Sequence, residues 1–239
     1  MGTYELLRFA DPEALARSVA AEWLKHAGRA AADPQPYCVA LSGGRIAKQF
    51  CAAVAQQAAA QPAGLRQVHF FWGDERCVAP SDPESNFGLA RDALLSPLGI
   101  AAGHIHRIKG EEPPERAAQL AERELRELVR RERQGQPMFD LVFLGLGEEG
   151  HVASLFPGES EELIKSSAVF RPVIATKPPP QRVTLGYPAL AAAEQVWVLA
   201  SGAGKERALA DSLTPGGRTP LGRVLTLRSA TKIFTDIAV

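Results

Sequence analysis

Residues 139–158 restrict the possible folds of this chain more than any other stretch. Residues 139–145 form a short apolar run that ends at a glycine, as in a strand that is buried on both faces. Such a strand needs a covering layer on each side. The run therefore predicts an α/β protein, in which a mostly parallel sheet has helices on both faces.

The turn after this run carries acid–base groups. Glycines at 145, 147 and 150 let the backbone turn sharply and bring Glu148, Glu149 and His151 close together. An imidazole titrates near neutral pH, and a neighbouring carboxylate can orient it or hold its proton. The turn therefore indicates proton transfer, while a loop histidine that bonds only a nearby carbonyl remains the alternative.

The same glycines satisfy the spacing of a dinucleotide-binding motif, and three observations argue against that interpretation. Two acidic residues would face the pyrophosphate, which prefers free backbone amides. Pro157 leaves little room for a helix after the turn, and no acidic residue ends a second strand about 20 residues further on. We interpret the turn as a catalytic loop rather than a nucleotide site.

Composition and charge favour a small-molecule partner. Lysine plus arginine total 27 and aspartate plus glutamate total 27, so there is no basic field to hold nucleic acid or an anionic membrane. Nothing marks a boundary within residues 1–239, which predicts a single domain. No signal-like core or run of about 18 apolar residues occurs, so we expect a cytoplasmic protein.

The cysteines predict free thiols. Cys38, Cys51 and Cys77 are odd in number and widely spaced, which argues against a disulfide framework and against a zinc site of paired cysteines. Cys77 follows a charged cluster, but small buried thiols are far commoner than nucleophiles, so it is given no role.

Strand and helix patterns alternate along the whole chain. Alternation of this kind predicts a parallel sheet whose strand ends meet at one edge, where ligands bind. We expect strands at 4–9, 37–41, 68–72, 139–145, 169–173, 195–200 and 233–238, with helices after 11, 44, 85, 186 and 205 and a charged helix at 113–133. A short strand through Ile108 would place His104 and His106 on one face; without a third ligand they are assigned no metal.

Two of the predicted strand ends have the composition of an anion cradle. Ser42-Gly43-Gly44 lies between a strand and a helix whose N-terminal amides are unpaired, and Arg45 adds a cation. Residues 202–205, Gly-Ala-Gly-Lys, follow a second strand in the same way. A third strand end places Asp74-Glu75-Arg76 at the same edge. The pattern indicates a small phosphorylated substrate with a proton transfer at its far end.

These segments resemble the 6-phosphogluconolactonase family over essentially the whole chain. The resembling motifs are Leu41-Ser42-Gly43-Gly44, Trp72 with Asp74-Glu75-Arg76 and Ser85-Asn86, residues 145–157, residues 179–185, and Gly202 through Lys205. The resemblance implies a modified Rossmann-like sheet and hydrolysis of 6-phospho-D-glucono-1,5-lactone in the oxidative pentose phosphate pathway. It implies no metal or other cofactor and a monomer, with a low-order oligomer left open.

This chain departs from the family pattern at two places. Family members often have Ser-Thr-Pro after the two glycines, where this chain has Arg45-Ile46-Ala47, and usually Asp where it has Glu149. The related glucosamine-6-phosphate deaminases resemble the chain at the Gly-His turn. Ser154-Leu155-Phe156 and Arg76 favour the lactonase, while a deaminase-like isomerase and a non-catalytic sugar-phosphate binding protein remain the alternatives.

The resemblance also implies roles for individual residues. His151 is expected to take the proton of water, Glu149 or Asp74 to set its tautomer, and Arg76 to offset negative charge near the reacting carbonyl. The phosphate is expected to contact Ser42, Gly43, Gly44, Arg182 and Lys205, with Arg45 as an extra contact.

Overall fold

The computed structural model describes residues 3–59 and 62–238. A six-stranded sheet forms its centre, with the strand order β1-β11-β10-β7-β2-β3 and every neighbouring pair parallel. The strands are β1 (Tyr4–Arg8), β2 (Tyr37–Leu41), β3 (Val68–Trp72), β7 (Leu141–Gly145), β10 (Gln195–Ala200) and β11 (Thr231–Thr235). The α/β class and the mostly parallel sheet predicted from the sequence are confirmed.

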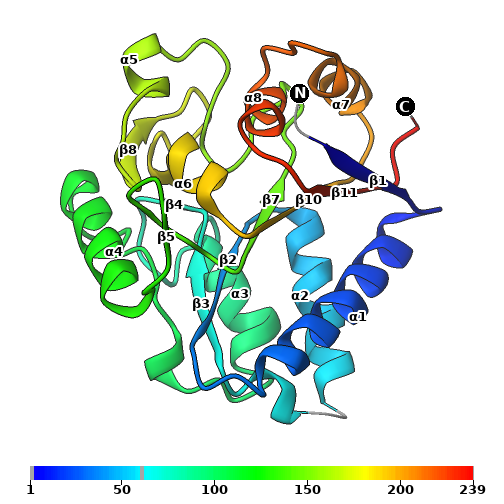
Figure 1. Cartoon of the computed structure of the whole chain (residues 1–239), viewed down its shortest axis with the longest axis vertical. Coiled ribbons are helices and arrows are strands. Elements are labelled where there is room, and N and C mark those ends of the chain that lie inside the picture. The colour runs from blue at the N-terminus through cyan, green and yellow to red at the C-terminus, as the bar shows by residue number, and fades with distance from the viewer. Residues whose placement is uncertain (1–2, 60–61, 239) are drawn as a thin grey trace.

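Helices cover both faces of this sheet (Figure 1). In the view shown, α1 and α2 lie below β10 and β11, and α7 and α8 lie above them. The helices are α1 (Pro12–Ala30), α2 (Arg45–Ala58), α3 (Asn86–Ala90), α4 (Pro114–Leu128), α5 (Glu161–Ile164), α6 (Tyr187–Ala192), α7 (Glu206–Leu213) and α8 (Pro220–Leu227). None of the helices in the described ranges is long and apolar enough to cross a membrane.

The first helix begins and packs as its sequence predicts. The carboxylate of Asp11 accepts a hydrogen bond from the amide of Ala14 at 2.7 Å, and Pro12 occupies the first turn. Trp23 is fully buried, and its ring contacts Phe50 of α2 and Phe143 of β7. Burial of such large rings joins α1, α2 and the centre of the sheet into one core.

A small antiparallel sheet stands beside the carboxyl ends of the central strands. It consists of β4 (Asp74–Arg76), β9 (Gln181–Leu185) and β8 (Phe170–Ile174), in the order β4-β9-β8. Its register pairs Asp74 with Thr184 and Arg76 with Arg182. Two short strands, β5 (Glu132–Arg133) and β6 (Gln136–Pro137), form a separate hairpin.

Several predicted elements differ from the structure. The strand expected through Ile108 is wrong: His104 ends a 3₁₀ turn (Ala102–His104), and His106 stacks on the ring of Phe71 instead. The helix expected to reach residue 133 ends at Leu128, where the chain turns into β5. Helix α8 had no counterpart in the predicted pattern.

Candidate active site

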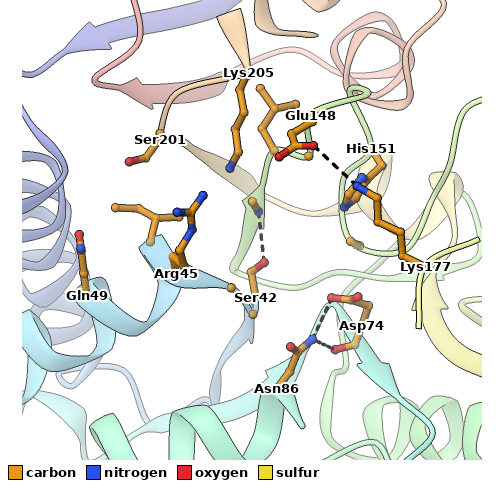
Figure 2. A pocket seen from close by; sticks show the side chains of 18 of the residues that line it. Ser42, Arg45, Gln49, Asp74, Asn86, Glu148, His151, Lys177, Ser201 and Lys205 are labelled. Carbon is orange, nitrogen blue, oxygen red and sulfur yellow. Dashed lines mark hydrogen bonds and ion pairs between the residues drawn. The ribbon is translucent and has the colours of Figure 1, made fainter. Parts of the chain in front are cut away.

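A cavity of about 400 Å³ opens at the carboxyl ends of β2, β3, β7 and β10 (Figure 2). The prediction that these four strand ends meet is therefore confirmed. Nine of the ten predicted site residues line the cavity, namely Ser42, Gly43, Gly44, Arg45, Asp74, Arg76, His151, Arg182 and Lys205. The tenth, Glu149, lies behind His151 and borders a separate surface hollow.

His151 and Glu149 form the acid–base pair of this cavity. Oε2 of Glu149 lies 3.2 Å from Nδ1 of His151, and both atoms are buried. Because Nδ1 faces the carboxylate, Nε2 is the ring nitrogen left to act on a ligand. The absence of a side chain at residue 147 makes this placement possible, since a Cβ on Gly147 would lie 2.0 Å from the imidazole ring.

Glu149 is held in its ionised form. Burial acts to raise the pKa of Glu149, but its own backbone amide, His151 and Lys177 outweigh that effect, and the pKa is lowered. An ionised carboxylate beside Nδ1 favours the tautomer with the proton on that nitrogen. It also stabilises the imidazolium that forms when Nε2 takes a second proton.

Asp74 has different partners from those expected. Its Oδ2 accepts from the hydroxyl of Ser154 at 2.6 Å, and its Oδ1 accepts from the side-chain amide of Asn86 at 3.3 Å. Among the described carboxylates, only Glu149 forms an ion pair with His151. Of the two residues suggested to set the imidazole tautomer, Glu149 therefore has the required position and Asp74 does not.

The N-terminus of α2 forms one end of the cavity. Gly44 at the helix cap has φ +91°, a conformation that favours glycine, and no side chain caps the free amides of the first turn. Gly43 packs so closely that a Cβ would lie 1.8 Å from Oδ1 of Asn86. The Ser42 hydroxyl accepts from the amide of Gly145 at 3.1 Å and keeps its own proton for a ligand.

Two cations, Arg45 and Lys205, lie next to this helix end. Burial and then the neighbouring Arg45 lower the pKa of Lys205, while Glu148 and Asp236 act in the opposite direction. Glu148 pairs with Lys177 at 3.7 Å, and no carboxylate in the described part of the chain forms an ion pair with Arg45 or Lys205. Two unpaired cations beside free helical amides are suited to a dianion such as phosphate.

In the second predicted cradle, residues 202–205, two backbone amides are bonded to side chains of the protein itself. The amide of Gly202 donates to Oδ1 of Asp236 at 3.2 Å, and the amide of Gly204 donates to Oε2 of Glu206 at 2.9 Å. Carboxylates of the protein thus occupy two of the donors that the sequence predicts for an anion. The turn contributes the side chain of Lys205 to the cavity instead.

Arg76 and Arg182 are neighbours on the small sheet. Nη1 of Arg76 donates to the carbonyl of Glu84 at 2.6 Å, and Nε of Arg182 donates to the carbonyl of Pro179 at 3.0 Å. Burial lowers the pKa of Arg182 most, and the positive charge of Arg76 lowers it further. The charges that act on Arg182 are thus those of the His151 end of the cavity, whereas Lys205 interacts with Arg45.

Sequence reasoning missed three contributors to this arrangement. Ser154 and Asn86 anchor Asp74, and Asp236 anchors the turn before Lys205. Ser154 and Asn86 lie inside the motifs shared with the lactonase family, so the sequence could have pointed to them. Asp236 lies 34 residues from its partner Gly202 and outside every such motif, so the sequence gives no signal for it. Burial raises the pKa of Cys77 to about 11, which keeps this thiol protonated and agrees with its having no assigned role.

The arrangement defines an α/β protein in which free helix amides, two cations and an imidazole–carboxylate pair share one cavity at the edge of the sheet. The model of the glucosamine-6-phosphate isomerase/6-phosphogluconolactonase family matches residues 10–233, and the chain belongs to this family.

Known relatives and solved structures resemble the chain over most of its length. A probable chloroplastic 6-phosphogluconolactonase of Oryza sativa is 32% identical, over 97% of this chain and 74% of its own. The 6-phosphogluconolactonase of Aggregatibacter actinomycetemcomitans is 34% identical, over 77% of each chain. The structure of 6-phosphogluconolactonase from Trypanosoma brucei, 25% identical, matches with a TM-score of 0.87 over 98% of this chain and 97% of its own.

Proposed function

We propose that this protein hydrolyses 6-phospho-D-glucono-1,5-lactone to 6-phosphogluconate, as the lactonase step of the oxidative pentose phosphate pathway. One observation carries the proposal: an unpaired cationic end, Arg45 and Lys205 at the start of α2, lies in the same cavity as the His151–Glu149 pair. Family membership and the lactonases among its relatives support the same reaction.

The reaction follows from the chemistry of a δ-lactone, which is an activated ester. Nε2 of His151 takes a proton from water while the water oxygen bonds to the lactone carbonyl carbon. The carbonyl electrons move onto its oxygen, where the positive charge of Arg76 offsets them. The bond to the ring oxygen then breaks, His151 returns the proton to that oxygen, and the new acid loses its own proton to solvent.

The remaining site residues bind and orient the substrate in this proposal. The phosphate is held by the free amides of α2, the hydroxyl of Ser42, and the side chains of Arg45 and Lys205. Arg182 on the small sheet supplies a further contact to it. Asp74 is fixed by Ser154 and Asn86 and faces the cavity, so its carboxylate can accept a sugar hydroxyl. We further propose that residues 1–239 act as one domain, as a cytoplasmic monomer and without a cofactor.

Proton release on addition of freshly made 6-phosphogluconolactone tests the reaction. We expect acid release well above the spontaneous rate, and no ammonia or fructose 6-phosphate from glucosamine 6-phosphate. Ammonia release with no effect on the lactone would assign the chain to the deaminase branch of its family. Tight binding of 6-phosphogluconate without turnover of either substrate would indicate a binding protein.

A further inference from the structure

Asp236 is a carboxylate that the proposed reaction does not use, and it bonds two residues that line the cavity, Ser201 and Gly202. It follows the last residue of β11, so it stands at a fifth strand end beside the four that form the site. Its Oδ2 accepts from the hydroxyl of Ser201 at 2.9 Å, and its Oδ1 accepts from the amide of Gly202 at 3.2 Å. The two oxygens thus hold two consecutive residues of the turn between β10 and α7.

This turn has little else to hold its shape. Gly202 and Gly204 have φ +99° and +86°, so the segment lies outside any sheet ladder or helix. Its other described anchors are local. The amide of Gly204 donates to the side chain of Glu206, and the carbonyl of Lys205 accepts from the amide of Leu209 in α7. Lys205 comes next, and its side chain points into the cavity beside Arg45 (Figure 2). The direction of Lys205 therefore depends on the conformation that Asp236 imposes.

A carboxylate in this place acts against anion binding by its charge. It interacts with Lys205, and its acceptor oxygen occupies the amide of Gly202 that would otherwise be free for a ligand. The negative charge of Asp236 repels a phosphate, and its oxygen takes up one backbone donor. Its favourable contribution to phosphate binding would come from the geometry that it gives the turn. This separates its two effects and makes them measurable.

We propose that Asp236 is a positioning residue that fixes the Ser201–Gly202 turn so that Lys205 reaches the phosphate. The inference rests on the proposed phosphate role of this end of the cavity. It predicts opposite results for two substitutions of the same residue, one that keeps the acceptor oxygen and one that removes it.

Asp236→Asn and Asp236→Ala provide the first test. Asparagine can accept from the amide of Gly202 and donate to the oxygen of Ser201, so it keeps the geometry and removes the charge. We expect its KM for 6-phosphogluconolactone to be at or below that of the wild type. Alanine removes both hydrogen bonds, and we expect KM to rise about 10-fold with kcat within about 2-fold. Equal KM increases in both variants, or no increase in the alanine variant, would overturn the proposal.

Further variants keep the test valid if Asp236→Ala folds poorly. Ser201→Ala removes one of the two anchors, so its KM should rise by less than that of Asp236→Ala; an unchanged KM would contradict the role of the turn. Asp211→Ala removes an exposed carboxylate of α7 whose one ion pair among the described residues is with Arg207, and it should leave KM unchanged. Unphosphorylated gluconolactone should be turned over at one rate by all variants, and a parallel loss on it would mean general damage.

Binding of inorganic phosphate separates this inference from the proposed function. Calorimetric titration of the wild type, Asp236→Asn and Asp236→Ala needs no turnover. Weaker binding in the alanine variant alone would support the positioning role even if the protein hydrolysed no lactone. Equal phosphate affinity in all three proteins would refute it even if the lactonase reaction were established.

Discussion

Arg45 and Lys205 differ from His151 in whether a carboxylate pairs with them. They form no ion pair with a carboxylate in the described ranges, while His151 has Glu149 at 3.2 Å. A cation without a counter-ion is available to a charged ligand, and a paired imidazole is oriented for proton transfer. The two ends of the cavity can therefore be tested separately by substituting one residue at each.

At the phosphate end, Lys205→Ala should weaken binding without affecting the chemical step. It removes a charge-assisted hydrogen bond worth about 1.5–3 kcal/mol, so KM should rise about 10- to 100-fold while kcat stays near the wild-type value. Steady-state kinetics with phosphorylated and unphosphorylated gluconolactone measures both effects. The control, Lys165→Ala, removes an exposed lysine that pairs with Glu161. Equal losses on both substrates would place Lys205 outside the phosphate site.

At the scale of elements, the turn after β7 positions the imidazole. A Cβ at Gly147 would lie 2.0 Å from the His151 ring, so the ring packs directly over the backbone. Gly150 has φ +84°, and a Cβ built on it would lie 2.8 Å from side-chain atoms of Thr219 at the start of α8. The turn is thus fixed by close backbone approach on both sides.

Gly147→Ala should consequently displace His151 from Glu149. We expect kcat to fall about 10- to 100-fold, since loss of an oriented base removes much of a contribution of about 10²–10⁴-fold. Thermal unfolding monitors the fold, and Gly28→Ala is the control because a Cβ on Gly28 meets nothing within 4 Å. A Gly147→Ala enzyme with wild-type kcat would show that the imidazole does not need this contact.

The elements also show what sequence patterns can and cannot predict. Strands 37–41, 68–72 and 195–200 were predicted with their observed bounds, because each is an apolar run buried in the parallel sheet. The strand through Ile108 failed because His104 and His106 pack on His69 from β3, a contact that no local pattern specifies. In the site, the motif residues were predicted, but Asp236, which anchors the turn before Lys205, lies 34 residues from its partner Gly202 and has no local signal.

At the scale of the whole molecule, a histidine cluster links the edge strand β3 to α4. Nδ1 of His69 lies 2.9 Å from Nε2 of His106, and Nδ1 of His106 lies 2.8 Å from Oε1 of Glu124. Burial, then His104 and His106, lower the pKa of His69 from 6.5 to about 4. The folded state therefore favours neutral His69, and this contribution to stability is complete above pH 6.5 and is lost as the pH falls toward 4.

Acidification should thus destabilise the wild type more than a variant without this imidazole. In His69→Asn, the side-chain amide can still donate toward His106 but does not titrate. Urea unfolding at pH 7.5 and at pH 5 should show a smaller loss of unfolding free energy for the variant. Identical losses in the two proteins would mean that His69 is not protonated on unfolding in this range.

The whole molecule should also work without a metal. No group of three or more His, Cys, Asp or Glu side chains in the described ranges could hold a metal ion. In the proposed mechanism, His151 and Arg76 supply the base and the charge that an activated ester requires. Lactonase activity should survive exhaustive chelation and should not rise with added zinc or magnesium. Loss on chelation with recovery by one metal would require a different mechanism.

The proposed role of His151 as the base for lactone hydrolysis is tested by the kcat of His151→Asn on 6-phosphogluconolactone. Asparagine keeps polarity but cannot take a proton at neutral pH, so kcat should fall about 10²–10⁴-fold while KM changes little. Circular dichroism and phosphate binding should match the wild type. A folded His151→Asn protein that turns over the lactone at the wild-type rate would show that His151 is not the base.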